Sequence, residues 1–142
     1  MQAIHRYLFG DVYEWAGQLR NIDISKGDNR FAHYAHIESA AMSIFMQLAK
    51  EKHMARLDAS AFSHRAAYYL GELNALHPFR EGNGRVQREF ISHLAHANGY
   101  YIAWESVSRA DMLQTAIESF NGDSSKLAAL IHQNLSALEP EA

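Results

Sequence analysis

The sequence predicts an all-α fold, a bundle of helices that carries one small β-hairpin. Long stretches of the chain place apolar residues at the spacing of a helix face, whereas residues 19–34 alternate at the spacing of a strand. Prolines stand only at positions 78 and 140, so no proline interrupts a helix before residue 78. The 142 residues, 48% of them hydrophobic, are enough for one continuous core. We therefore expect a single domain over residues 1–142.

Five helices are expected from this pattern. The second is preceded by Asp58 or Ser60 as its N-cap, and the fourth by Ser106 or Ser108. Gly99 follows the third helix, in the position where a glycine commonly ends a helix. The five helices cover residues 36–53, 58–76, 84–98, 109–120 and 124–138.

The hairpin is expected within residues 19–34. Ile22 and Ile24 alternate, a turn follows at residues 26–29, and the apolar pattern resumes at Phe31. A lone hairpin is marginally stable in water, so we expect it to lie on the helical body as a flap over about residues 20–34.

Composition excludes several classes of protein. The net charge of −3 argues against nucleic-acid binding, which usually needs a basic excess. Without cysteine, neither a disulfide nor a thiolate zinc site can form. No apolar run is long enough to span a bilayer, and the N-terminal residues lack a signal-peptide core. The cytoplasm is the expected location.

The stretch HPFREGNGRVQR, residues 77–88, concentrates polar groups and glycine in one loop. The residues from Gly82 to Gly84 permit a tight turn that opens the next helix, where free backbone N–H groups and the helix dipole form an anion site. Arg85 and Arg88 lie three residues apart on one helix face and lean toward that turn. The arrangement suits a polyphosphate better than a single carboxylate.

A carboxylate and an imidazole flank this predicted anion site. Glu81 would be repelled by phosphate unless a cation lay between them, and Mg²⁺ commonly binds one or two carboxylates together with phosphate oxygens. Pro78 disfavours helical backbone at His77, which should therefore end the second helix. A histidine can be neutral near pH 7 and accept a proton from a hydroxyl group.

The same stretch resembles the signature of Fic domains, H-x-F-x-[D/E]-G-N-G-R-x-x-R, and fills all eight of its fixed positions. Two further segments are similar to the family: VYEWAGQLR at 12–20 resembles V-Y-x-W-A-G-x-x-R, and ISKGDNRFA at 24–32 resembles the family's flap. The resemblance covers most of the chain. It implies a single Fic-type helical bundle with a β-hairpin flap and the signature loop at 77–88.

The resemblance also implies an activity, protein adenylylation (AMPylation), in which AMP passes from Mg-ATP to a Ser, Thr or Tyr hydroxyl of a target protein and pyrophosphate is released. It implies His77 as the general base and Glu81 as the ligand of Mg²⁺. The flap residues Lys26 and Phe31 are expected to hold an extended target segment as an added strand. The nucleotide-binding residues that it implies are Gly82, Asn83, Gly84, Arg85, Arg88 and Asn121.

Alternatives stay open at this point. Phe31 could equally be a core residue, and Asn121 a helix C-cap before Gly122. The chain could be a nucleotide-binding interaction module without transfer activity, although such a module needs neither a base nor a metal carboxylate. It could also be a Fic-fold phosphotransferase or another nucleotidyltransferase. The intact Gly82 and Gly84 favour AMP transfer, because relatives that transfer phosphate carry alanine and lysine there.

Regulation is suggested by a missing motif. Many Fic proteins contain an inhibitory helix with [S/T]-x-x-x-E-[G/N], but no Ser or Thr of this sequence is followed by Glu four residues later. The segment 100–123 resembles the toxin–antitoxin branch of the family. It therefore implies a toxin or effector core held by a small antitoxin-like inhibitory protein, with an inhibitory helix outside this sequence as the alternative. Effectors injected into host cells share this branch, so delivery into a host cell is the alternative to action in the cytoplasm.

Overall fold

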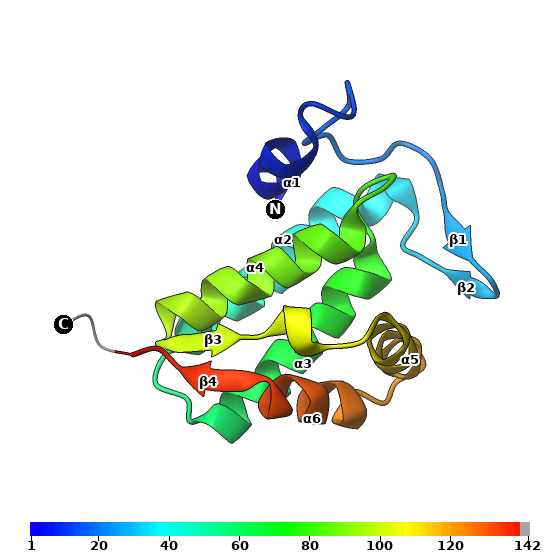
Figure 1. Cartoon of the computed structure of the whole chain (residues 1–142). Coiled ribbons are helices and arrows are strands. Elements are labelled where there is room, and N and C mark those ends of the chain that lie inside the picture. Colours follow the sequence, from blue (N-terminus) through cyan, green and yellow to red (C-terminus); the bar gives the residue numbers. More distant parts are fainter. Residues whose placement is uncertain (140–142) are drawn as a thin grey trace.

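A computed structural model describes residues 1–139, and it confirms the predicted all-α fold with a small hairpin (Figure 1). The central helix α3 (Ala59–Leu76) packs against α2 (Ile37–Lys50), α4 (Asn83–Ala97) and α6 (Ser125–Gln133). Helix α5 (Arg109–Phe120) contacts both α3 and α6. Helix α1 (Gln2–Phe9) lies against α4.

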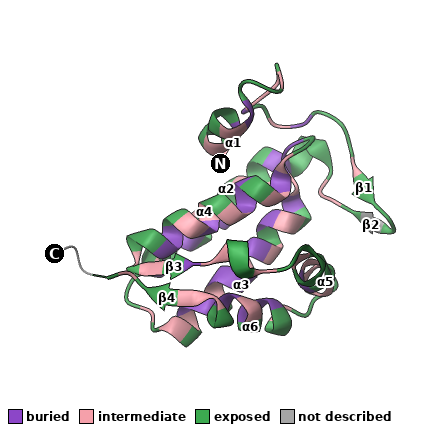
Figure 2. Ribbon diagram, in the orientation of Figure 1, coloured by how far each residue is buried: buried purple, intermediate pink, exposed green. Residues whose placement is uncertain are grey.

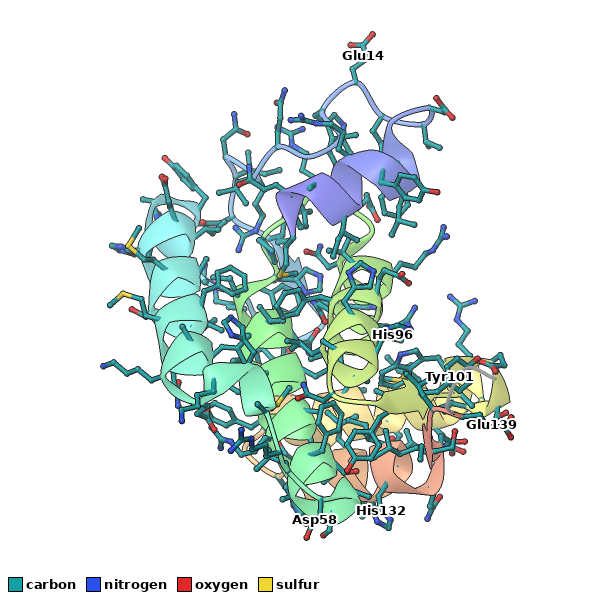
Figure 3. All side chains as sticks on the ribbon, turned by 90° about the vertical axis from the view of Figure 1, so that its left-hand side faces the viewer. Glu14, Asp58, His96, Tyr101, His132 and Glu139 are labelled. Carbon is teal, nitrogen blue, oxygen red and sulfur yellow. The ribbon has the colours of Figure 1, made fainter. Side chains whose placement is uncertain are left out.

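The direction of α3 places its two ends at opposite ends of the molecule. Figure 3 shows Asp58, which precedes α3, and His132 of α6 projecting at the end of the molecule opposite to α1. The C-terminal end of α3, where His77 follows, therefore lies at the end near α1. There the chain turns through the signature loop into α4.

Two short antiparallel strand pairs complete the fold. The flap is formed by β1 (Ser25–Lys26) and β2 (Asn29–Arg30), joined by the turn that the sequence predicted. The second pair, β3 (Tyr100–Ile102) and β4 (Leu135–Ala137), joins the segment after α4 to the segment after α6. Three short 3₁₀ turns cover residues 34–36, 52–54 and 104–106.

The structure differs from the expected helices in three ways: one helix was missed, and two helices end earlier than expected. Helix α1 was not among the five expected helices. The helix expected over 36–53 ends at Lys50, because the backbone turns left-handed at residues 52–54, with φ of 55° at His53. The last helix ends at Gln133 instead of continuing to Leu138, because the chain then extends and pairs with β3.

The predicted helix caps are confirmed. The side chain of Asp58 accepts a hydrogen bond from the backbone N–H of Ala61, and Ser108 accepts one from the N–H of Asp111. Gly99 has φ of 82° just past α4, in the left-handed region that glycine favours.

The core lies along α3, and a smaller apolar cluster supports the signature loop. Figure 2 shows buried positions following the faces of α3 and α4 that point inward. The smaller cluster joins Phe9, Phe79 and Val86, so α1 is packed directly beneath the loop. Within residues 1–139, no helix combines the length and the apolar character needed to cross a membrane.

Candidate active site

A cavity of about 660 Å³ opens where the flap, the signature loop and α5 meet. One end of it is polar and carries most residues of the predicted site. The other end is mainly apolar and is lined by Leu70, Gly71, Trp104, Val107, Met112, Leu113, Ala116 and Leu127, and α5 adds the polar side chains of Arg109 and Ser119 to the lining. The polar end is lined by Lys26, Asn74, His77, Arg80, Glu81, Gly82, Asn83, Gly84, Arg85 and Arg88. A charged group and an apolar group of one ligand could therefore bind side by side.

His77 ends α3 in a left-handed conformation, with φ of 46° and ψ of 64°. Its Nδ1 lies 3.2 Å from the backbone carbonyl of Asn74. Because a carbonyl oxygen only accepts, Nδ1 must carry the hydrogen in this bond, and the neutral ring then keeps its lone pair on Nε2. The side chain is thus held in the tautomer that can accept a proton from an incoming hydroxyl.

The surroundings of His77 keep its imidazole neutral. The pKa of His77 is lowered to about 4, chiefly by burial and also by the positive charges of Arg20 and Lys26, which together outweigh the opposing hydrogen bond to the carbonyl of Asn74. The ring of Phe31 stacks on the imidazole with 3.8 Å between ring centroids and 10° between ring planes. Phe31 therefore shields one face of the imidazole from water.

The signature loop is held in shape by the side chain of Asn83. Its Oδ1 accepts from the N–H of Phe79 at 2.9 Å, and its Nδ2 donates to the carbonyl of Phe79 at 2.7 Å. Asn83 is only 3% exposed, so this side chain is used within the loop. What it offers a ligand is its backbone N–H, at the first position of α4.

A glycine is needed at position 82 because its backbone is left-handed and because Phe9 leaves no room for a side chain. Its φ is 81°, and a Cβ placed there would lie 2.4 Å from Cε2 of Phe9. The close approach brings the loop onto α1. No side chain caps the start of α4, so its first N–H groups face the cavity end of the helix. Such N–H groups, together with the helix dipole, are the arrangement that can bind an anion, as the sequence predicts for this loop.

The two signature arginines line the cavity as expected. Arg88 is half-buried, and its guanidinium lies against Gly84, since a Cβ on Gly84 would be 3.1 Å from Nη1 of Arg88. Burial, and then the charge of Arg85, lower the pKa of Arg88. Arg85 lies over the ring of Phe9, with 5.4 Å from Cζ to the ring centroid. A polyanion would relieve the repulsion between these two cations.

Glu81 is the acid that lines the cavity. No group of three or more His, Cys, Asp or Glu suited to a metal ion occurs in the part of the chain that the structure describes. A metal at Glu81 would therefore complete its ligand shell with phosphate oxygens and water. That donor set fits Mg²⁺, which keeps several waters and binds through one or two carboxylates together with substrate phosphates.

Two residues of the predicted site, Phe31 and Asn121, do not line the cavity. Phe31 covers the imidazole of His77 and also meets Phe120 edge-on, at 5.7 Å between ring centroids. Asn121 is the C-cap residue of α5, is exposed, and is absent from the cavity lining, while Gly122 after it has φ of 101°. Lys26 of the flap does line the cavity.

Two buried polar residues of this site were not predicted. The Nδ1 of His5 accepts from the N–H of Gly17 at 2.8 Å, so its Nε2 carries the hydrogen and donates to the carbonyl of Glu81 at 2.9 Å. The ring of His5 also stacks on Phe79, 4.1 Å between centroids. Arg20 is the other residue, and the only signal for it was its place at the end of the V-Y-x-W-A-G-x-x-R segment.

The model of the Fic/DOC family matches residues 1–95, which include the flap and the whole signature loop. The chain belongs to the Fic/DOC family. This Fic domain is 58% identical over 135 residues to the protein adenylyltransferase VbhT of Bartonella schoenbuchensis and 44% identical over 133 residues to the probable protein adenylyltransferase y4lH of Sinorhizobium fredii. These matches cover 95% and 93% of the chain. The chain spans 28% of the length of VbhT and 69% of that of y4lH.

Solved structures share the fold of this Fic domain. The BepC effector protein of Bartonella tribocorum, solved with bound AMPPNP, aligns with a TM-score of 0.89 at 25% identity, over 97% of this chain and 73% of that one. The Fic domain of an effector from Bartonella quintana, solved with bound ADP, aligns with a TM-score of 0.90 at 25% identity, over 97% and 72%. Both of those structures hold an adenine nucleotide.

Proposed function

We propose that this Fic domain is a protein adenylyltransferase that transfers AMP from ATP to a hydroxyl group of a target protein. One observation carries the proposal: a neutral histidine, with its lone pair on Nε2, lines the same cavity as an anion site made of a helix N-terminus and two arginines. The names of VbhT and y4lH support it, as do the nucleotides bound in the two Bartonella structures.

The geometry suggests a division of labour along the cavity. The N–H groups at the start of α4 would hold the α- and β-phosphates, and Arg85 and Arg88 the outer phosphates. The apolar end, between α3 and α5, would take the adenine base. The α-phosphorus would then lie between the apolar end and the arginines, in front of His77. The role of Asn121 at the ribose or base rests on the resemblance alone.

In the proposed reaction, Nε2 of His77 accepts the proton of the target hydroxyl while that oxygen attacks the α-phosphorus. A bond forms between the target oxygen and the α-phosphorus, and the bond to the bridging oxygen of pyrophosphate breaks in line with it. Pyrophosphate leaves with the electron pair of the broken bond. The backbone N–H groups at residues 82–84 and the arginines stabilise the charge on the phosphates. Magnesium, held by Glu81, would supply further charge neutralisation there.

The flap is proposed to present the target. Its strands have an exposed edge to which an extended segment could add as a third strand, with Lys26 and Phe31 nearest the hydroxyl. We extend the proposal to the domain as a whole: residues 1–142 act as one catalytic domain of a toxin or effector, regulated by a small antitoxin-like partner. Its place of action would be the cytoplasm, either of its own cell or of a host.

The test is label transfer to protein in a lysate with Mg²⁺, with ATP labelled at the α- or the γ-phosphate. We expect label from the α-phosphate only, lost in His77→Ala and kept in the matched control His93→Ala, whose exposed imidazole lies on α4 beside Glu89. Label from the γ-phosphate would make the protein a phosphotransferase. No label from either position, with ATP still bound, would make it a binding module.

A further inference from the structure

Arg20 is a buried charge whose side-chain hydrogen bonds all go to backbone carbonyls, and the nearest carboxylate, that of Asp23, lies 4.0 Å from its Nη1. Its side chain has no solvent exposure. Its Nε donates to the carbonyl of His77 at 2.7 Å, and its Nη2 donates to that of Leu76 at 3.2 Å. Its Nη1 donates to the carbonyl of Ile22 at 2.7 Å, and Nη2 also donates to that of Ala32. One planar guanidinium thus joins four carbonyls.

Two of these carbonyls belong to the end of α3. The last carbonyls of a helix have no partner within the helix, and a cation there is favoured by the helix dipole. Arg20 therefore caps α3 at Leu76 and His77. The bond to the carbonyl of His77 fixes the peptide plane beside that residue, and so the direction in which its imidazole leaves the backbone.

The other two carbonyls belong to the two legs of the flap. Ile22 precedes β1 and Ala32 follows β2, and each of these strands is only two residues long. A hairpin of this size has little stability of its own, so its position depends on its base. Backbone bonds reinforce the base, since the N–H of Arg20 donates to Pro78 at 2.9 Å and that of Ala32 donates to Ala75 at 3.1 Å.

We propose that Arg20 is a positioning residue that holds the flap in register with His77, so that a hydroxyl presented along the flap meets the imidazole Nε2. The inference rests on the proposed function, because register between flap and base matters only if the flap presents the acceptor. Arg20 does not line the cavity and does not touch the nucleotide site. Its effect on the reaction passes through the flap and the backbone of His77.

Arg20→Lys is the informative variant. It keeps the positive charge and most of the volume, but an ammonium has three donors on one atom and cannot reproduce the planar fork that reaches four carbonyls. Arg65→Lys is the matched control. Arg65 also makes a bidentate interaction, at 2.7 Å to each carboxylate oxygen of Glu51, but it lies in the first half of α3, away from the flap.

Three quantities are measured for both variants: the initial rate of α-phosphate label transfer into lysate protein at saturating Mg-ATP, the dissociation constant of Mg-AMPPNP, and the pKa of His77 by NMR titration of its imidazole. For Arg20→Lys we expect the rate to fall about 100-fold, the cost of misplacing reacting groups by about 1 Å. The AMPPNP affinity should change less than about threefold, because Asn83 and His5 hold the anion loop independently. The pKa of His77 should rise as the flap loosens.

The proposal is overturned if Arg20→Lys transfers label at the rate of Arg65→Lys, or if AMPPNP affinity falls as much as the transfer rate does. It is also overturned if the His77 pKa does not move. If the wild type labels no protein, the proposed function fails, and the His77 titration of Arg20→Lys still decides whether Arg20 couples flap and histidine.

Should Arg20→Lys not fold, Arg20→Gln is measured in its place. Hydrogen exchange of the Arg20 Nε–H in the wild type gives a second test. We expect slow exchange, in step with the flap amide of Phe31, which donates to Ile24. Exchange at the rate of a free guanidinium would overturn the proposal.

Discussion

The low pKa of His77 makes the stability of this domain depend on pH in a way that one substitution removes. The folded state holds the imidazole neutral down to a pKa of about 4, whereas an ordinary histidine has a pKa of 6.5. Below pH 6.5 the unfolded chain binds a proton that the folded chain does not. The contribution of His77 to the free energy of unfolding is therefore at its most favourable above pH 6.5, and it falls as the pH drops from 6.5 toward 4.

The size of the effect follows from the size of the shift. Each pH unit in this window costs about 1.4 kcal/mol of the free energy of unfolding, so between pH 6.5 and pH 5 the loss is about 2 kcal/mol. This is an upper bound, since His77 keeps some contact with water. In His77→Gln, the part of the pH dependence of stability that comes from His77 should be absent. The other eight histidines are present in both proteins, so their contributions cancel in the difference.

The assay is urea denaturation of wild type and His77→Gln at pH 7, 6 and 5. We expect the wild type to lose stability relative to the variant by about 2 kcal/mol over this range. Phe31→Ala should reduce the difference, because it opens one face of the imidazole to water. If the stability difference between wild type and His77→Gln is constant from pH 7 to pH 5, the imidazole is not held neutral by its surroundings, and our account of the base is refuted.

Three further predictions concern the signature loop. Gly82→Ala should cost at least about 2 kcal/mol of unfolding free energy, because alanine is strained at φ of 81° and its Cβ would overlap Phe9; an unchanged urea midpoint would contradict this. Asn83→Ala should lower the free energy of unfolding by about 1 to 3 kcal/mol and weaken AMPPNP binding, because it leaves the N–H and carbonyl of Phe79 without partners. Calorimetry measures the binding, and an unchanged AMPPNP affinity would argue against the loop's role. EDTA should abolish label transfer, added Mg²⁺ should restore it, and Glu81→Gln should need at least about tenfold more Mg²⁺; an equal requirement would remove Glu81 as the ligand.

The sequence predicted the signature loop well because its signals are local. Pro78 and the run from Gly82 to Gly84 fix the backbone over a few residues, and the arginines follow at helical spacing. Asp58 and Ser108 cap their helices as expected for the same reason. Where the backbone's partners are neighbours in the chain, the residue types carry the information.

Contacts between distant segments could not be predicted in this way. The bonds of Arg20 reach carbonyls 56 and 57 residues away, and a backbone carbonyl has no sequence signature. The strands β3 and β4 also pair across a long stretch of chain, so the helical pattern of α6 alone could not predict that α6 ends where this pairing begins. The left-handed turn at residues 52–54 is built from Lys, His and Met, without the glycine that usually marks such a turn in a sequence.

Helix α1 has a practical consequence for anyone who expresses this domain. Its His5 supports the carbonyl of Glu81 and its Phe9 fills the space beneath Gly82, although each lies more than 70 residues before its partner in the chain. A shortened version that starts after residue 20 would keep the whole signature sequence but lose the residues of α1 against which the signature loop packs. A purification tag or fusion partner is therefore safer where it leaves the first helix free to dock, and the smallest active fragment must begin before it.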